Sequence, residues 1–392
     1  MQRYRYLIVG GGMTADAACK GIRDLDSEGS IGLVGDEPYP PYSRPPLSKG
    51  LWKGAPEEKV WRRTEEIGVD LHLRRRVVSL DLGARQATDD QGEIYVYERL
   101  LLATGGRPRR LPGDGPEVIY FRTLDDYRRL RALAQEEGSS FLVVGGGFIG
   151  SEIAAALAMS ERRVTMVFPE TGIGARLFPV DLAEFLNSYY RERGVEVVAG
   201  DTVTSLAQEG SRAALTGSGR AIEATGIVAG LGIEPEVELA ASALLPVEDG
   251  VVVDELGRVG GRDDVFAAGD VARFPAPPLG TLRVEHEDHA NSHGRAVGRN
   301  MAGAGEPYHH LPFFYSDLFD LGYEAVGELD GRLRTVSDWR DPYREGVVYY
   351  LDREDRVRGV LLWNVWGKVD DARALVRSGE RVDPGSREWR LA

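Results

Sequence analysis

The segment 141–152, with the sequence FLVVGGGFIGSE, constrains the fold of this chain more than any other stretch. Four apolar residues run directly into glycines at positions 145, 147 and 150, and a stretch rich in Ala and Leu follows. This order predicts a buried parallel strand, a tight turn and the start of a helix. Gly145 would allow the turn, Gly147 would let a pyrophosphate approach the backbone, and Gly150 would allow close packing of helix on strand. The pattern predicts a dinucleotide site, although an isolated glycine turn of this kind is also common elsewhere.

A second apolar run at 163–168 supports the dinucleotide interpretation. It ends just before Glu170, where a carboxylate can accept hydrogen bonds from a ribose hydroxyl pair. An acid at this place repels a 2′-phosphate, so the sequence predicts NADH rather than NADPH.

A similar strand–glycine turn–helix pattern occurs near the start of the chain. Residues 6–9 predict a strand, Gly10, Gly12 and Ala15 form the GxGxxA variant, and a helix is expected at 13–23. A second strand, 31–34, leads to Asp36 and Glu37. Two dinucleotide sites in one chain suggest a flavin and a nicotinamide, and the simplest chemistry between them is hydride transfer.

Composition excludes several other classes. With 392 residues, we expect two or three domains. The net charge of −14 argues against nucleic acid as a partner. No apolar run is long enough to span a membrane, and the first strand begins within the first ten residues, which leads us to expect a cytoplasmic protein. The single cysteine, Cys19, excludes a dithiol relay within one chain, so electrons would have to leave directly from the flavin.

The segment 38–52 is rich in proline and carries Arg44 and Lys49. Its five prolines predict extended backbone that holds side chains in place. Only five of the 48 basic residues are lysines, and the compact ammonium of Lys49 would suit a site with room for one point charge near a flavin ring. A lysine in a surface loop is the alternative.

The stretch 41–52, PYSRPPLSKGLW, together with the two glycine turns, resembles the apoptosis-inducing factor branch of the FAD-dependent pyridine nucleotide oxidoreductases. Relatives of that branch include ferredoxin and rubredoxin reductases. The resemblance implies an α/β fold with two Rossmann-like nucleotide-binding domains and a C-terminal α/β domain. The implied boundaries are an FAD-binding domain at 1–119 and 233–310, an NAD-binding domain at 120–232 and the C-terminal domain at 311–392.

The expected FAD contacts come from the first glycine turn and from the resemblance. A strand at 265–272 would present Asp270 to a ribityl hydroxyl, because Gly269 permits close approach. Tyr315 stands where members of the branch usually have a tryptophan against the flavin. The complete expected set is Gly10, Gly12, Met13, Thr14, Asp36, Glu37, Arg44, Lys49, Val77, Arg122, Asp270, Glu285, His286, Glu287 and Tyr315.

The expected NAD contacts cluster around the second glycine turn. Arg176 and Glu324 enter by resemblance, and a surface role is the alternative for Arg176. The set is Gly145, Gly146, Gly147, Phe148, Ile149, Gly150, Glu152, Glu170, Arg176, Gly232 and Glu324.

Four residues are predicted to act in catalysis: Lys49, Glu152, Phe148 and His286. Lys49 and Glu152 would form a partly buried ion pair near flavin N5, because a buried charge normally requires a partner. Phe148 would be a gate that moves when the nicotinamide stacks, and its alternative role is packing at the helix start. A metal site is not predicted at His286 and His289, because this helical spacing supplies two ligands at most.

We therefore predict an FAD-dependent NADH dehydrogenase that transfers hydride from NADH C4 to flavin N5. Slow reoxidation, or transfer to an acceptor through a charge-transfer complex, would follow. The acceptor could be a ferredoxin, a rubredoxin, a quinone or oxygen. One alternative is a ferredoxin or rubredoxin reductase component, and another is an NADH-responsive redox switch that dimerises or binds a partner.

Overall fold

The computed structural model describes residues 1–111, 115, 117–206 and 213–391. The chain divides into two compact units. Unit 1 comprises residues 1–43, 57–107 and 234–313, and unit 2 comprises 44–56, 108–233 and 314–392. The proline-rich segment 44–56 thus belongs to unit 2, although the chain on both sides of it belongs to unit 1. Each unit is described by itself.

Unit 1 is built on a mixed sheet with the strand order β3-β2-β1-β6-β5-β4, and β19 also pairs with β6. β1 pairs in parallel with both β2 and β6, as the alternation of strand and helix predicts. A smaller sheet has the order β17-β18-β20-β21. The elements are β1 Gln2–Val9, α1 Met13–Arg23, β2 Ile31–Gly35, β3 Val69–Leu73, β4 Val77–Asp81, β5 Gln86–Asp89, β6 Ile94–Leu102, α5 Glu238–Ser242, β17 Val247–Glu248, β18 Gly250–Val252, β19 Val265–Ala267, β20 Ala272–Pro275, β21 Thr281–Leu282 and α6 Glu287–Met301, with short 3-10 turns η2 Glu57–Val60, η3 Thr64–Ile67 and η4 Gly269–Val271.

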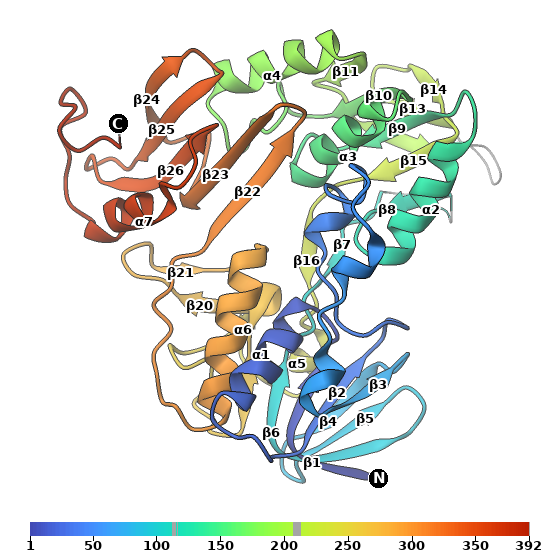
Figure 1. Ribbon diagram of the computed structural model, residues 1–392, viewed down its shortest axis with the longest axis vertical. Coiled ribbons are helices and arrows are strands. Elements are labelled where there is room, and N and C mark those ends of the chain that lie inside the picture. Colours follow the sequence, from blue (N-terminus) through green and yellow to red (C-terminus); the bar gives the residue numbers. More distant parts are fainter. Residues whose placement is uncertain (112–114, 116, 207–212, 392) are drawn as a thin grey trace. The chain divides into compact units, whose positions relative to one another are not determined.

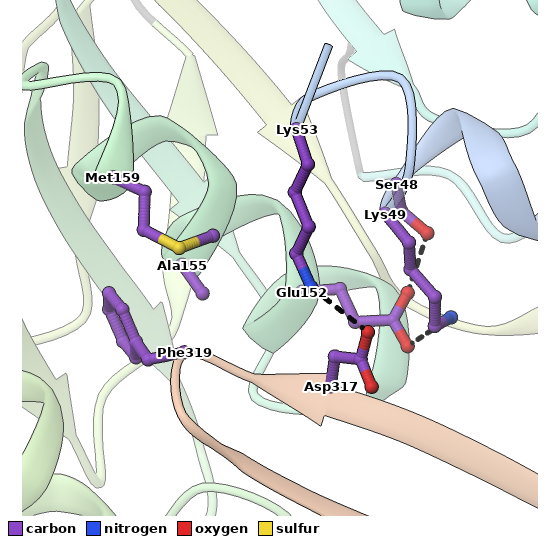
Figure 2. Close-up of a pocket in the computed structure, with 8 residues that line it drawn as sticks. All are labelled: Ser48, Lys49, Lys53, Glu152, Ala155, Met159, Asp317 and Phe319. Carbon is purple, nitrogen blue, oxygen red and sulfur yellow. Dashed lines mark hydrogen bonds and ion pairs between the residues drawn. The ribbon is translucent and has the colours of Figure 1, made fainter. Parts of the chain in front are cut away.

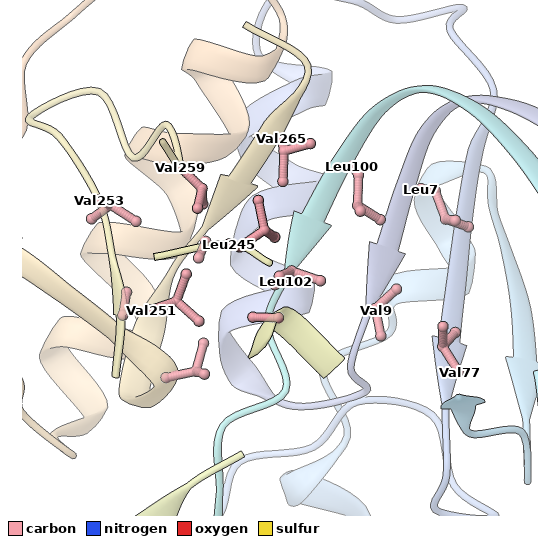
Figure 3. Close-up of a cluster of buried hydrophobic side chains, with 14 of the residues drawn as sticks. Leu7, Val9, Val77, Leu100, Leu102, Leu245, Val251, Val253, Val259 and Val265 are labelled. Carbon is pink, nitrogen blue, oxygen red and sulfur yellow. The ribbon is translucent and has the colours of Figure 1, made fainter. Parts of the chain in front are cut away.

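Helices α1 and α6 lie side by side in unit 1 (Figure 1). Two glycines of α6 make this approach possible. A Cβ on Gly294 would lie 2.5 Å from Thr14 O, and one on Gly298 would lie 2.1 Å from Ala18 O. On the other side of the sheet, strand residues such as Leu100 and Leu102 pack with Val251 and Val265 in a buried apolar cluster (Figure 3). This burial is the main stabilising contribution to unit 1.

The central part of unit 2 is a parallel sheet with the order β11-β10-β9-β15-β8, beside an antiparallel sheet β12-β13-β14. The apolar run predicted as a buried strand is β9, which pairs in parallel with β10 and β15. The elements are η1 Pro45–Leu47, β8 Val118–Tyr120, α2 Leu124–Gln135, β9 Ser140–Val144, α3 Phe148–Met159, β10 Arg163–Phe168, α4 Val180–Glu192, β11 Val195–Ala199, β12 Val203–Leu206, β13 Ala213–Thr216, β14 Ala221–Glu223 and β15 Gly226–Ala229. Two short strands, β7 Gly106–Pro108 and β16 Ile233–Pro235, pair with each other.

The C-terminal part of unit 2 is an antiparallel sheet with the order β22-β23-β26-β25-β24, against which α7 packs. Its largest buried side chain is Trp363, which is fully buried. The elements are β22 Phe313–Leu318, β23 Leu321–Gly327, β24 Arg334–Asp341, β25 Glu345–Leu351, β26 Val357–Trp363 and α7 Val369–Ser378.

The predicted α/β fold class and the helix at 13–23 are confirmed. Two local predictions were wrong. The segment 38–52 is not extended throughout, because Pro45 begins the 3-10 turn η1 and hydrogen-bonded turns follow it. A proline φ suits the first turn of a helix as well as extended backbone. The strand expected at 265–272 ends at Ala267, and Gly269 and Asp270 lie in η4.

Candidate cofactor and active site

The turn between β9 and α3 has the geometry of a dinucleotide site. Gly145 has a φ of +112°, and a Cβ there would lie 2.4 Å from Gly230 O. A Cβ on Gly150 would lie 2.0 Å from Gly145 O, so this glycine allows the helix to pack on the turn. Among the described residues, by contrast, no atom lies within 4 Å of a Cβ on Gly147. The space beside Gly147, next to the N–H groups at the start of α3, therefore fits a pyrophosphate.

Glu170 follows β10, as the prediction requires. Arg176 Nε lies 2.6 Å from Glu170 Oε1, and the Arg176 side chain is 80% exposed. Two of the residues expected to contact NAD are thus brought together. The carboxylate keeps one oxygen for a ribose hydroxyl, while an exposed ion pair of this kind contributes about 0–1 kcal/mol to stability.

Lys49 and Glu152 form the predicted ion pair. Lys49 Nζ lies 2.7 Å from Glu152 Oε1, and the two side chains are 13% and 4% exposed. Glu152 lies in the second turn of α3, so the pair is close in sequence and in space to the glycine turn. Lys49 Nζ also lies 5.1 Å from the centre of the Tyr315 ring, which permits a cation–π contact.

Two serines at this site were missed by the sequence reasoning. Ser48 Oγ donates to Glu152 Oε2 at 2.6 Å, and Ser316 Oγ donates to Oε1 at 2.6 Å. Figure 2 shows Ser48, Lys49 and Glu152 in a small pocket that also contains the half-exposed pair of Lys53 and Asp317, at 3.2 Å. Nothing in the sequence marks Ser316 as a partner of Glu152, because the two residues meet only through the tertiary fold.

Phe148, the predicted gate, is the first residue of α3 and packs against aromatic rings of the C-terminal sheet. Its ring centre lies 5.3 Å from that of Phe314 and 6.5 Å from that of Tyr323. Tyr323 in turn stacks on Trp363 at 5.6 Å. Both of the roles considered for Phe148 fit this position, because the ring packs at the helix start and yet stands beside the open Gly147.

Glu324 lies in β23, and among the described residues its Oε2 atom has no hydrogen-bond partner. Burial raises the pKa of this carboxyl group. The unpaired oxygen is an acceptor on the strand where a contact to NAD is expected, and this role of Glu324 stays a prediction.

In the first glycine turn, in unit 1, one glycine is also required by close packing and another also has open space beside it. Gly10 has a φ of +123°, and a Cβ there would lie 2.1 Å from Ala103 O. The Cβ position of Gly12 has no described atom within 4 Å. Beyond β2, Asp36 pairs with Arg76 at 3.2 Å, and Tyr42 donates to Glu37 Oε2 at 2.6 Å. This turn fits a second pyrophosphate.

Asp270, in η4, lies in the same part of unit 1 as the first glycine turn. The neighbouring Gly269 has a φ of +75°, and a Cβ there would lie 2.1 Å from Thr14 Oγ1 at the start of α1. Gly269 N also donates to His293 Nδ1 at 3.3 Å. The Gly–Asp pair and the first glycine turn thus converge, and together they fit the pyrophosphate and ribityl parts of FAD.

Helix α6 carries two buried histidines, His289 and His293, and a third, His286, stands directly before its first residue. Burial lowers the pKa of His286 to about 4 and that of His293 to about 3. The pKa of His289 is also well below its usual value, because of burial and the neighbouring histidines. The His289 ring stacks on Phe274 with 4.4 Å between centres. Over the described ranges, no group of three or more His, Cys, Asp or Glu residues could hold a metal ion.

Comparison with known proteins agrees with this geometry. Residues 4–294 match the family model of the pyridine nucleotide-disulphide oxidoreductases, and residues 297–342 and 337–378 match the C-terminal model of the mitochondrion-associated apoptosis-inducing factor. The chain belongs to the pyridine nucleotide-disulphide oxidoreductase family. It has a single cysteine, Cys19, which is fully buried, so a pair of cysteines within one chain takes no part in its chemistry.

Several members of the family are similar over nearly the whole chain. Apoptosis-inducing factor 1 of Dictyostelium discoideum is 31% identical, covering 98% of this chain and 80% of the relative. Monodehydroascorbate reductase 1 of Oryza sativa is 35% identical, covering 92% of this chain and 82% of the relative. Among solved structures, the reductase in a covalent putidaredoxin reductase–putidaredoxin complex has a TM-score of 0.90 at 29% identity, covering 98% and 95% of the two chains.

These findings confirm the predicted resemblance to apoptosis-inducing factor and the predicted activity class. The protein is an FAD-dependent NADH oxidoreductase with FAD and NAD(H) as cofactors. Solved structures similar to it include a ferredoxin reductase from Rhodopseudomonas palustris and a putidaredoxin reductase captured with putidaredoxin. None of the helices in the described residues is both long and apolar enough to cross a membrane.

The structure distributes the predicted site residues between the units. All expected NAD contacts lie in unit 2, whereas the expected FAD contacts divide. Arg44 Nη1 donates to Arg122 O at 2.8 Å, so two expected FAD contacts meet within unit 2. Two further expected FAD contacts, Lys49 and Tyr315, also lie in unit 2. The remaining expected FAD contacts lie in unit 1: Gly10, Gly12, Met13, Thr14, Asp36, Glu37, Val77, Asp270, Glu285, His286 and Glu287. The individual roles of all these residues stay predictions, as do the domain boundaries.

Proposed function

We propose that the protein oxidises NADH bound to unit 2, by hydride transfer from C4 of the nicotinamide to N5 of FAD, and then passes the electrons to a separate acceptor. FAD, when bound, supplies the ring that takes up two electrons as a hydride and gives them up again. The observation that carries the proposal is the pair of open glycine turns, one in each unit. Each follows a parallel strand, and each leaves space beside its second glycine.

NADH is favoured over NADPH by Glu170. Its carboxylate stands at the end of β10, where the adenosine ribose of a dinucleotide on the second glycine turn would lie. A 2′-phosphate there would meet a negative charge, while a ribose hydroxyl pair would meet an acceptor. Arg176 orients the carboxylate through its 2.6 Å contact and offers some compensation to a phosphate, so we expect the preference to be strong but not absolute.

Lys49 and Glu152 would act as a pair of fixed charges at the nicotinamide end of the NAD site. A buried ammonium stabilises negative charge that develops on neighbouring groups during hydride transfer, and it needs no reorganisation to do so. Phe148 would move away from Gly147 when the nicotinamide stacks. His286, neutral above about pH 5, would contribute a hydrogen-bonding ring without a charge.

Two alternatives remain for what the reduced flavin does next. A small electron carrier such as a ferredoxin or rubredoxin is supported by the similarity to the reductase captured with putidaredoxin. The similarity to apoptosis-inducing factor supports the alternative, in which NAD stays stacked after reduction and the complex binds a partner or dimerises. A homodimer and a cytoplasmic location stay predictions.

One experiment tests the proposal and separates the two alternatives. The purified flavoprotein is mixed with NADH in the absence of oxygen, and its spectrum is followed before and after air is admitted. We expect bleaching of the flavin by NADH, with NADPH much slower. Rapid return of the oxidised spectrum, accelerated by ferredoxin, would identify a reductase. A long-lived absorbance band at long wavelength would identify the stacked complex, and no bleaching would contradict both.

A further inference from the structure

Glu152 has more partners than the ion pair requires. Its carboxylate is buried and receives three donors from two separate segments of unit 2. Lys49 and Ser316 contact Oε1, at 2.7 and 2.6 Å, and Ser48 contacts Oε2 at 2.6 Å. The two serine hydroxyls have no part in the function proposed above.

The arrangement of the three donors determines how the carboxylate can move. A single ammonium–carboxylate contact leaves rotation of the carboxylate open, because either oxygen can face the ammonium. With a separate hydroxyl donor on each oxygen, rotation breaks charge-assisted hydrogen bonds, which are among the stronger ones. The plane of the carboxylate is therefore held with one oxygen towards Lys49, whose ammonium lies 5.1 Å from the centre of the Tyr315 ring.

Ser316 also contacts a second side chain, that of Tyr323. Ser316 lies in β22 directly after Tyr315 and is fully buried. Burial raises the pKa of Tyr323 well above the usual value, so the tyrosine stays protonated. β22 thus supplies both the ring beneath Lys49 and a donor to Glu152.

We propose that Ser48 and Ser316 are positioning residues for the Lys49–Glu152 pair: they hold the carboxylate in one orientation, so that the ammonium stays in one place while charge moves during hydride transfer. The proposal rests on the function proposed for the pair. It assigns to the serines no contact with either cofactor. A carboxylate that is already oriented lowers the barrier of a reaction more than one that must reorient during the reaction.

The test compares Ser48→Ala, Ser316→Ala and the double variant with the parent protein. Ser139→Ala is the matched control, since Ser139 is a buried serine of unit 2 whose Oγ has no hydrogen-bond partner among the described residues. Anaerobic stopped-flow measurements at a series of NADH concentrations separate the rate constant of flavin reduction from the dissociation constant. We expect each serine variant to lower the rate constant about tenfold, as expected for the loss of one hydrogen bond to a charged group, with the dissociation constant changed about twofold or less. Ser48→Thr keeps the hydroxyl, so its rate constant of flavin reduction should be close to that of the parent and higher than that of Ser48→Ala.

A second measurement does not depend on activity. The ammonium groups of the five lysines are followed by nitrogen–proton correlation NMR, and Lys49→Met identifies the signal of Lys49. We expect that signal to be protected from exchange with water in the parent and in Ser139→Ala, and to broaden or vanish in the two serine variants.

The outcomes distinguish this proposal from the proposed function. If Glu152→Gln slows flavin reduction but the double serine variant does not, the positioning role is wrong and the role of the pair stands. If Glu152→Gln has no effect, both are wrong. A serine variant that melts at a lower temperature with an unchanged rate constant and an unchanged Lys49 signal would show a structural role only and would overturn the proposal.

Discussion

Lys49 and Glu152 come from distant parts of the chain, yet Lys49 Nζ lies 2.7 Å from Glu152 Oε1 with both side chains largely buried. Removing water from two charges is costly, so the pair persists because each charge compensates the other and because serines satisfy the carboxylate. Its position directly after the turn predicted to bind NAD makes it the most informative place to test function.

Neutralising one member of the pair should damage stability and catalysis together. In Lys49→Met, the buried carboxylate loses its counter-charge, and we expect a loss of about 3 kcal/mol in the free energy of unfolding and a ~100-fold slower reduction of the flavin by NADH. The double variant Lys49→Met/Glu152→Gln should regain much of the stability but not the rate. Denaturant unfolding and stopped-flow spectroscopy measure the two effects. Lys53→Met is the control, since its half-exposed pair with Asp317 should contribute less than about 1 kcal/mol. A double variant with parental rates would contradict the catalytic role.

The preference for NADH should depend on Glu170. We expect Glu170→Ala to lower the ratio of kcat/KM for NADH to that for NADPH by ~10–100-fold, because one repulsive charge and one acceptor are lost together. Arg176→Ala should lower kcat/KM for NADPH more than for NADH. Steady-state kinetics with both nucleotides measure these ratios. Glu196→Ala, which removes an acid half-exposed on the adjacent strand β11, should leave the ratio unchanged.

The glycines of the second turn should separate binding from folding. In Gly147→Ala, the new Cβ finds open space, so the melting temperature should stay within a few degrees of the parent while KM for NADH rises at least ~10-fold. In Gly150→Ala, the Cβ would lie 2.0 Å from a backbone oxygen, so we expect loss of stability. Calorimetry and kinetics on both variants make the comparison. Normal NADH binding by Gly147→Ala would mean that the pyrophosphate lies elsewhere.

Acid should destabilise unit 1 through the histidines at the start of α6 whose pKa values are lowered. The folded-state pKa values of His286 and His293, about 4 and about 3, lie below the unfolded value near 6.5. Between pH 6.5 and 4 the unfolded chain therefore binds more protons than the folded chain, and the free energy of unfolding falls as the pH falls. At pH 5 the loss is about 2 kcal/mol for each such histidine.

Denaturant unfolding of the FAD-bound protein at pH 7 and pH 5 measures this dependence. His289→Phe removes one buried histidine and should make the fall between the two pH values smaller, whatever its effect on absolute stability. An equal fall in the parent and in His289→Phe would show that other groups are responsible.

The fold class and the location of both dinucleotide turns could be predicted from the sequence. The turn at Gly145 and the close packing at Gly150 could be assigned in advance, because a glycine turn between a buried strand and a helix is a local structure that neighbouring residues determine. The role of Gly147 towards a pyrophosphate stays a prediction. The same holds for the helix at 13–23 and for Glu170 at the end of its strand. The local prediction failed at Pro45, where a proline φ is compatible with two structures.

Only the tertiary structure could decide which residues surround Glu152. Lys49 was predicted as its partner from the need of a buried charge for compensation, but that need does not say which hydroxyl groups complete the site. Ser48, Ser316 and Tyr315 come from a proline-rich segment and from a strand of the C-terminal sheet, and their meeting depends on how these elements pack around α3. The same rule applies to His286, His289 and His293, at and within the start of α6, because the loss of solvent contact that lowers their pKa values depends on tertiary packing and not on any local sequence pattern. Local backbone chemistry thus determined where the two glycine turns form, and long-range packing determined the charge and hydrogen bonding of the side chains around Glu152.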